Sequence, residues 1–205
     1  MAGRAAERRR KKEAGGMLDD TRLECEKIPR SAKRVFKGVI YDVYRWRQRM
    51  FDGSYTVFER LRRPNTAAVI AVSKSRIFIA CEEQPRSKRE IGLFTGRAAK
   101  NEEPIATARR ELLEESGLAS EDWELLEVFE PSPHIDWSIY LFAAKGCRKV
   151  KEPHLDSGER IEVRTVDFKG FMSLAHRFGG DIGNYLSEIG ESKAKTEKLR
   201  KKLLG

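Results

Sequence analysis

Three glutamates near the middle of the chain have the residue type and spacing of a metal site. Glu111, Glu114 and Glu115 stand at positions i, i+3 and i+4, so they share one face if the segment is helical. Such like charges destabilise a helix by roughly a few tenths of a kcal/mol per pair, and the negative end of the helix dipole adds to that cost. A divalent cation removes both costs, and magnesium prefers hard oxygen ligands. Any one of these glutamates could be a solvated surface residue, but the cluster indicates a phosphate-processing metal site.

The segment that carries these glutamates has clear helix signals. Proline in the first turn and Gly117 after the last turn predict a helix over Pro104–Ser116. Ile105, Ala108 and Leu112 recur at helical spacing and supply an apolar stripe. We therefore expect the helix to bury one face and to present the carboxylates on another.

The rest of the chain predicts more strands than helices. Apolar alternation and turn residues indicate a hairpin that includes residues 35–43 and 51–58, a second hairpin of buried strands at 67–72 and 77–80, and further strands at 91–94, 123–129, 138–144 and 161–166. Helical patterns follow at 168–178 and 182–189, and the basic C-terminal stretch could form one last, mostly exposed helix. The predicted class is a mixed α and β protein.

The residues around the glutamates fill every fixed position of the Nudix box. The string consists of Gly96, Glu102, Arg110-Glu111-Leu112, Glu114-Glu115 and Gly117-Leu118. By this loop-helix-loop signature the chain resembles the Nudix hydrolase family. The resemblance implies an α/β (α+β) fold, a Nudix-type α/β/α sandwich around a mixed β-sheet, preceded here by a small N-terminal antiparallel strand region. It also implies attack of water on a phosphorus, with Mg²⁺ as the cofactor or Mn²⁺ in its place.

The resemblance assigns roles residue by residue. The implied metal ligands are the carbonyl of Thr95 and the carboxylates of Glu111, Glu114 and Glu115. Arg110, a further catalytic candidate, orients the loop and helix together with Glu102. Gly96 and Gly117 have backbone roles, and Gly96 also stands beside the substrate.

Beyond the box, residues 35–190 resemble the branch of the family that acts on ADP-ribose. Residues 37–53 look like the strand region through which those enzymes dimerise and complete the substrate pocket. Arg86 resembles an arginine that meets the substrate at a strand end, although an ordinary surface arginine would look the same. A later loop of this branch brings an acidic residue over the metals as a general base or water-orienting group, and we predict Glu159 for this role, with Glu162 second.

Two departures from the branch pattern touch the predicted site. Phe94-Thr95 stands where proline and a small residue are usual, so the turn loses the restraint of proline. After Pro133 the expected glycines are replaced by His134 and Ile135, and we expect this bulkier loop to reshape the pocket around the distal ribose. Trp46 could stack the base of a substrate, although a strand tryptophan more often belongs to a core.

The formal charge of +9 is concentrated at the two ends of the chain. Residues 1–12 carry +5 and residues 191–205 carry +4, which leaves residues 13–190 formally neutral. Basic ends can contact RNA or another acidic surface, but solvated ends are the simpler interpretation. Nucleic acid is therefore a candidate partner that the sequence does not favour.

The sequence predicts four segments. They are a disordered basic arm (1–20), an N-terminal strand region for dimerisation and the substrate pocket (21–63), a Nudix catalytic domain (64–190) and a basic C-terminal helix or tail (191–205). Cys25, Cys81 and Cys147 match no zinc spacing and are expected to be reduced structural thiols. No apolar run approaches the roughly 18 residues that span a bilayer, and no secretory signal is present, so we expect a cytoplasmic protein without membrane contact.

The whole sequence predicts hydrolysis of the diphosphate linkage in ADP-ribose or a related nucleoside diphosphate sugar. The products would be a nucleoside monophosphate and a sugar phosphate, and the resemblance implies a homodimer. One alternative within the same chemistry is an RNA-end-processing or nucleotide-housecleaning pyrophosphatase, for which the basic ends give electrostatic support. Another is a non-catalytic Nudix module that binds a nucleotide, against which the intact set of carboxylates argues.

Overall fold

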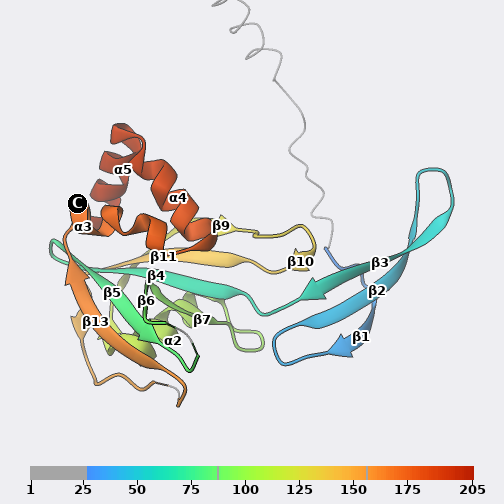
Figure 1. The fold of residues 1–205 in the computed structure, drawn as a ribbon, viewed down its shortest axis with the longest axis horizontal. Coiled ribbons are helices and arrows are strands. Elements are labelled where there is room, and N and C mark those ends of the chain that lie inside the picture. Colours follow the sequence, from blue (N-terminus) through green and yellow to red (C-terminus); the bar gives the residue numbers. More distant parts are fainter. Residues whose placement is uncertain (1–26, 87, 156) are drawn as a thin grey trace, which may run out of the picture.

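Two β-sheets follow each other along the chain and are joined by the short link 63–65 (Figure 1). The structure is a computed structural model that describes residues 27–205 apart from residues 87 and 156. The predicted arm 1–20 and Cys25 lie outside the described residues. The second sheet forms the centre of the main body, and the first projects away from it.

The sheet of the main body is seven-stranded and mixed. Its order is β13-β5-β4-β11-β9, with β6 paired to β5 and β7 paired to β4. Strands β4 and β11 run parallel, and the other neighbours are antiparallel. The strands are β4 (Thr66–Ser73), β5 (Arg76–Glu83), β6 (Glu90–Gly92), β7 (Phe94–Arg97), β9 (Asp122–Phe129), β11 (Ile139–Lys145) and β13 (Arg160–Val166). The central β4 is a continuous apolar run because both of its faces are covered.

Helices cover both faces of this sheet (Figure 1). Helix α2 (Pro104–Ser116) lies on one face, followed by the short pair β8 (Leu118–Ala119) and β12 (Arg148–Lys149). The other face carries α3 (Phe168–Ser173), the 3₁₀ turn η1 (Ala175–Arg177), α4 (Gly180–Gly190) and α5 (Lys193–Leu204). The predicted α/β/α sandwich is therefore confirmed.

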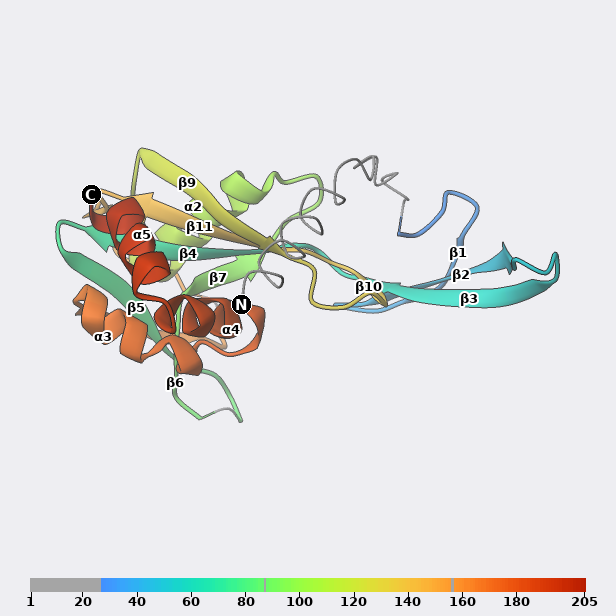
Figure 2. The same ribbon diagram turned by 90° about the horizontal axis from the view of Figure 1, so that it is seen from above.

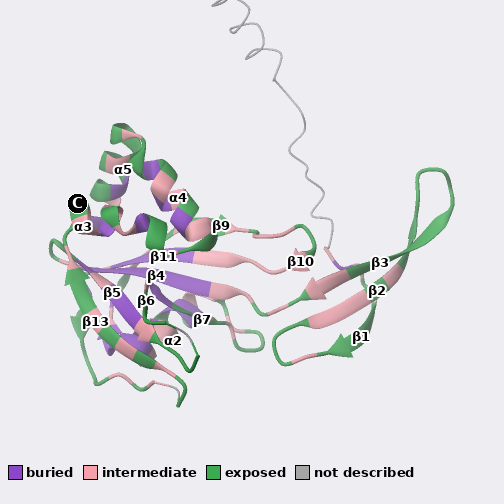
Figure 3. Cartoon of the chain, viewed as in Figure 1, coloured by how far each residue is buried: buried purple, intermediate pink, exposed green. Residues whose placement is uncertain are grey.

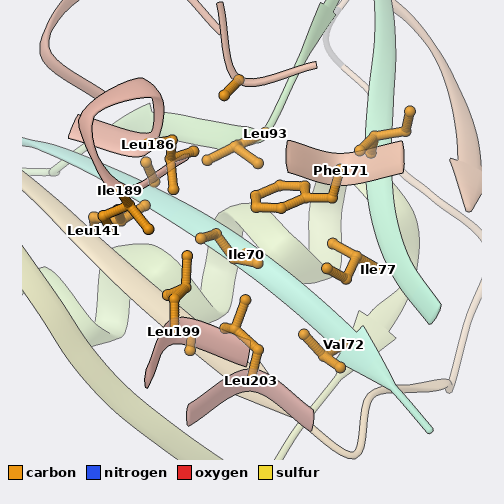
Figure 4. Packing of buried hydrophobic residues seen from close by; sticks show 14 residues of the cluster. Ile70, Val72, Ile77, Leu93, Leu141, Phe171, Leu186, Ile189, Leu199 and Leu203 are labelled. Carbon is orange, nitrogen blue, oxygen red and sulfur yellow. The ribbon is translucent and has the colours of Figure 1, made fainter. Parts of the chain in front are cut away.

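Each face of the sheet has its own hydrophobic core. On the side of α2, Phe94, Ala108 and Leu112 are fully buried. On the opposite side, Ile70 and Phe171 lie in a larger cluster that α4 and α5 complete (Figure 4). The sheet is thus held rigidly between two packed layers, which is the support that a site at the end of α2 requires.

The projecting N-terminal sheet has no comparable core. It contains β1 (Lys33–Lys37), β2 (Asp42–Arg49), β3 (Tyr55–Arg62) and the two-residue β10 (Ile135–Asp136), in the order β1-β2-β3-β10. Figure 2 shows it extending from the body as a nearly flat ribbon. Residues 33–62 are all exposed or half-buried (Figure 3). Burial within the described chain therefore does not explain the many apolar side chains of this sheet.

Most predicted elements are confirmed, and the bounds of α2 agree with the prediction. Three predictions need correction. The hairpin arm expected at 35–43 is β1 and the first residues of β2, because the chain turns between Gly38 and Tyr41. The strand expected at 91–94 is two strands, β6 and β7, because the chain changes partner from β5 to β4 around Leu93. The helix expected at 168–178 is α3 followed by η1.

The last helix is confirmed and most of its residues are exposed. However, Leu199 and Leu203 are buried in the larger core, and Lys202 Nζ lies 2.6 Å from Glu124 Oε1. Helix α5 therefore closes one side of the main body.

Cys81 and Cys147 are buried free thiols, as expected for structural cysteines. Among the helices of the described residues, none combines the length and apolar character needed to cross a bilayer.

The packing of α5 leads to a stability prediction. We expect Leu199→Ala and Leu203→Ala each to lower the free energy of unfolding by about 2–5 kcal/mol, because each leaves a cavity in a closed core. Lys198→Ala, on the exposed side of the same helix, should change it by about 0.5 kcal/mol or less. Urea unfolding of the three variants measures the difference. Equal, small effects at all three positions would contradict the packing of α5 against the core.

Candidate active site

Helix α2 is fixed at both ends and along its apolar face. Its first turn carries Pro104, and its last turn ends at Gly117, which has φ 71° and donates its N–H to Leu113 O. A Cβ at Gly117 would collide with the backbone oxygen of Lys151. Glycine is therefore required here for two reasons: it adopts the left-handed conformation without strain, and it leaves room for the backbone of Lys151. With Leu112 buried beneath it, the polar face of α2 is held towards a cavity.

This cavity has a volume of about 770 Å³ and lies between α2, the ends of β5 and β7, and the loop before β13. Its walls are strongly polar. The lining residues include Glu111, Glu114, Glu115, Thr95, Gly96, Arg110 and Glu159, all predicted from the sequence, together with Arg63, Thr66, Glu82, Gln84, Arg97 and His154. The structure thus brings the residues of the box and the candidate base Glu159 to one place.

Arg110 is the centre of the polar network in this cavity. Its Nε lies 2.9 Å from Glu102 Oε1, and its Nη2 lies 2.9 Å from Glu102 Oε2. Nη2 also donates to the carbonyl of Arg97, at 2.9 Å. Nη1 lies 2.7 Å from Glu111 Oε1 and 3.1 Å from Glu114 Oε2. One guanidinium therefore joins the loop before α2 to two of the three clustered carboxylates.

Glu115 is the most buried of the three carboxylates, at 7% exposure. Its Oε2 accepts a hydrogen bond of 3.0 Å from the backbone N–H of Thr95. Burial, followed by the negative charge of Glu111, raises the pKa of the Glu115 carboxyl to about 9. The pKa of Glu111 is also raised, mainly by burial, although Arg110 opposes the shift. The ionised forms of these two residues therefore need additional positive charge.

The donor set fits a hard divalent cation. Carboxylate oxygens on one helix face beside a buried, uncompensated carboxylate are the ligands that magnesium prefers. Gly96 leaves room for them, because a Cβ at this position would overlap the carboxyl group of Glu111. As placed, no three His, Cys, Asp or Glu side chains of the described chain already form a metal site. Arg110 Nη1 bonds both Glu111 and Glu114 in this arrangement.

Four other predicted residues do not line this cavity. Arg86 lines an adjoining hollow of about 380 Å³, which shares Gln84 and Glu159 with it. Glu162 contacts Arg89 and Arg164, and these arginines lower its pKa to about 2. Because the flanking Ile161 and Val163 pack on the α2 side of the sheet, strand alternation directs Glu162 to the opposite face.

The other two lie nearer the N-terminal sheet. His134 is exposed in the turn before β10, and its carbonyl accepts from Leu61 N. Trp46 is on β2 and packs against Phe58, with ring centroids 5.9 Å apart. Within one chain, Trp46 therefore contacts the N-terminal sheet rather than the cavity.

Arg63 is a residue of the cavity that the sequence reasoning missed. Its guanidinium lies 4.2 Å from the ring of Trp137 and 5.5 Å from that of Tyr41. Among the described residues, its Nε is the buried side-chain nitrogen that has no hydrogen-bond partner. Arg63 also lines a second cavity of about 600 Å³ beside the first. Arg63 therefore lines both cavities, and its buried Nε–H has no hydrogen-bond acceptor. No local pattern in the sequence predicts this position.

Glu82 and His154 were also not predicted as site residues. Glu82 ends the buried part of β5, and its charge contributes to the raised pKa of Glu115. His154 lines the cavity because its backbone N–H donates to Glu114 O, 2.8 Å away, at the end of α2. Both positions depend on loop and strand pairing, which spacing along the chain does not reveal.

Comparison with known proteins agrees with this geometry. A family model described as NUDIX domain matches residues 61–184. The chain belongs to the Nudix family. The predicted relationship to Nudix pyrophosphohydrolases is thereby confirmed, and the matched segment contains the complete box and the candidate base.

Two curated relatives and one solved structure extend the comparison. The chain is 31% identical over 153 residues to a methanol dehydrogenase activator of Bacillus methanolicus, covering 73% of this chain and 79% of the relative. It is 27% identical over 146 residues to an ADP-ribose pyrophosphatase of Bacillus subtilis (strain 168), covering 69% of this chain and 79% of the relative. A crystal structure of an ADP compounds hydrolase matches with a TM-score of 0.58 at 18% identity, over 70% of this chain and 79% of that one. This last match shows that the fold is shared.

The pairing of Glu102 with Arg110 leads to a pH-dependent prediction. The hydrogen bonds from Arg110, and then from Ala99 N, lower the pKa of Glu102 from 4.5 to about 2. A depressed acid contributes stability that is present above its unfolded pKa and is lost as the pH falls through its folded pKa. Glu102→Gln should therefore cost about 1–3 kcal/mol at pH 7, and the difference from wild type should shrink below pH 4.5 and vanish near pH 2.

Urea unfolding between neutral and acid pH measures this difference. Glu103→Gln is the matched control, because Glu103 is exposed and its side chain makes no cap hydrogen bond. A cost at Glu102 that does not vary with pH, or an equal cost at Glu103, would contradict the role assigned to the pair.

Proposed function

We propose that this Nudix protein hydrolyses the diphosphate linkage of ADP-ribose or a related nucleoside diphosphate sugar, with magnesium or manganese as its cofactor. The products are a nucleoside monophosphate and a sugar phosphate. The observation that carries the proposal is the 770 Å³ cavity, whose lining includes four glutamates and two arginines: Glu111, Glu114, Glu115, Glu159, Arg63 and Arg110. The ADP-ribose pyrophosphatase among the relatives supports this choice of substrate class.

The proposed site has separate binding and reacting parts. Glu111, Glu114, Glu115 and the carbonyl of Thr95 hold the divalent cation, which when bound neutralises diphosphate oxygens and makes a nearby water more acidic. Arg63 donates to a substrate phosphate, because its side chain lines both cavities and its guanidinium is held against the rings of Trp137 and Tyr41. The second cavity, reached past Arg63, offers space for the part of the substrate beyond the diphosphate.

Glu159 is the proposed general base. It lines the cavity, and its negative charge contributes to the raised pKa values of Glu111 and Glu115. In the proposed reaction it accepts a proton from the attacking water. The new P–O bond forms at one phosphorus as the bond to the bridging oxygen breaks, and that oxygen leaves with the other phosphate. Arg86, at the rim of the adjoining hollow, is a second candidate for phosphate contact.

Product analysis tests the reaction directly. Incubation with ADP-ribose and magnesium should yield AMP and ribose 5-phosphate, and a chelator should abolish turnover. Glu115→Gln should lower kcat/KM by about 100-fold or more, because it removes a charged cation ligand without changing side-chain size. Full activity of this variant, or turnover in excess chelator, would contradict the proposed site.

The two candidate bases provide a matched control in the same assay. Glu159→Gln should lower kcat by about 100-fold, the usual lower limit for the loss of a general base. Glu162→Gln carries the same change on the opposite face of β13 and should retain kcat. The reverse result would transfer the role to Glu162.

We also propose that the working form is a homodimer in which the N-terminal strand region, residues 21–63, contacts a second copy. The support is that Trp46 and Phe58 form an aromatic pair that the described chain does not bury. Trp46 does not line the cavity of its own chain. In a dimer, it would stack on the base of a substrate bound in the cavity of the second copy. A single-chain mass by light scattering at micromolar concentration would contradict the dimer.

A further inference from the structure

The N-terminal sheet has two faces with different chemistry. Successive residues of a strand point to opposite faces, and the register pairs Trp46 with Phe58 and Arg47 with Val57. One face therefore carries the aromatic pair, and the other carries a row of arginines along β2. We call the second face the arginine face and define it by Lys33, Arg45, Arg47, Arg49, Tyr55 and Val57.

The N-terminal sheet region has a large positive charge. The zero net charge of residues 13–190 conceals it, because the flanking segments are acidic. Residues 27–63 contain eleven lysines and arginines against three acidic residues, a formal charge of +8. Residues 13–26 and residues 64–190 each carry −4, so the sum over 13–190 is zero. The prediction that basicity belongs only to the ends of the chain is therefore incomplete. A strong positive field surrounds the projecting sheet.

The cationic groups of the arginine face are largely unpaired. Arg45 is held by Glu59, with 2.5 Å between Nε and Oε2. Arg47 and Arg49 have no carboxylate partner within the described chain. Instead, the guanidinium carbon of Arg47 lies 4.8 Å from the ring centre of Tyr55. Both charges are thus available to an anion without first breaking an ion pair.

Exposed rings and apolar side chains accompany these charges. Tyr55 is 56% exposed and Val57 is 66% exposed on the arginine face. Phe36 is paired in register with Val43 on the same face and is 60% exposed, while Phe51 at the hairpin tip is fully exposed. Cationic side chains beside exposed rings are the combination that binds single-stranded nucleic acid, with arginines on phosphates and rings on bases.

The geometry of β2 matches a chain of phosphates better than a folded protein surface. Alternate residues of an extended strand are about 6.8 Å apart, so Arg45, Arg47 and Arg49 form a straight and evenly spaced row. Pairing this face with its copy across a twofold axis would place arginines against arginines. A flexible polyanion avoids this repulsion and can follow the straight row of arginines.

We propose that the arginine face binds single-stranded nucleic acid along β2 and β3. This surface is separate from the cavity and from the aromatic face assigned to the dimer, so the inference does not depend on the proposed reaction. Strand β3 leads directly to the link 63–65, which lines both cavities.

Fluorescence anisotropy of the full chain with a labelled oligouridine of about 15 nucleotides tests the proposal, since single-strand sites span roughly 4–16 nucleotides. Affinity should fall as salt rises from about 50 to 200 mM. The double variant Arg47→Gln/Arg49→Gln should weaken binding about tenfold or more and reduce the slope of log K against log salt by about 1.4, because two phosphate contacts are lost.

A matched double variant removes the same charge elsewhere. Lys198→Gln/Lys201→Gln lies on the exposed side of α5 and should leave binding within about twofold of wild type. Unchanged turnover of ADP-ribose and an unchanged circular dichroism spectrum would show that both double variants fold. Loss of binding only in the α5 variant would assign nucleic acid to the basic C-terminal end and overturn the proposal. No salt-sensitive binding by the wild type would also overturn it.

Two further measurements separate nucleic acid from other occupants. Tyr55→Ala should weaken oligouridine binding about tenfold and leave the binding of inorganic polyphosphate unchanged, because only the nucleic acid has bases to stack. Equal effects on both probes would overturn the assignment to nucleic acid. If Arg47→Gln/Arg49→Gln changed the mass measured by light scattering but not oligouridine binding, the face would be a contact between copies, and the proposal would fail.

Discussion

A single guanidinium positions the reactive end of this protein. Arg110 bonds both oxygens of Glu102, the carbonyl of Arg97 and the carboxylates of Glu111 and Glu114, so it ties the loop before α2 to the helix itself. Five hydrogen bonds to one rigid, planar group fix the loop more firmly than separate surface pairs would. The same contacts restrain two of the clustered carboxylates.

The second constraint is the burial of negative charge. Glu115 lies under β7 with the backbone N–H of Thr95 as its hydrogen-bond donor, and Glu111 is close enough to raise its pKa further. Buried charges that lack compensation destabilise a fold, so the position of Glu115 indicates a functional role rather than a structural one. Gly96 fits this interpretation, since any side chain there would occupy the space of the Glu111 carboxyl group.

The two large sheets differ in packing and in surface chemistry. The main body is packed on both faces and is therefore rigid, whereas the N-terminal sheet buries little and carries a row of exposed arginines along β2. Its aromatic and arginine faces differ in chemistry. The link 63–65 joins the two parts, and Arg63 at this link contacts both cavities. The projecting sheet and the cavity are therefore joined by a short link.

The sequence by itself determined the elements whose signals are local. Pro104, Gly117 and the apolar stripe between them define α2, and the spacing of Glu111, Glu114 and Glu115 follows from helical periodicity alone. The tertiary structure decided every relation between distant segments. It placed Glu159 in the cavity and Glu162 on the other face of β13, a distinction that depends on strand register. It brought Arg63 between Tyr41 and Trp137, residues more than seventy positions apart in the chain. It also placed Arg45, Arg47 and Arg49 on one exposed face of the projecting sheet, which depends on strand pairing. Local signals arise from neighbouring residues, whereas these features arise from packing and pairing that only the folded chain specifies.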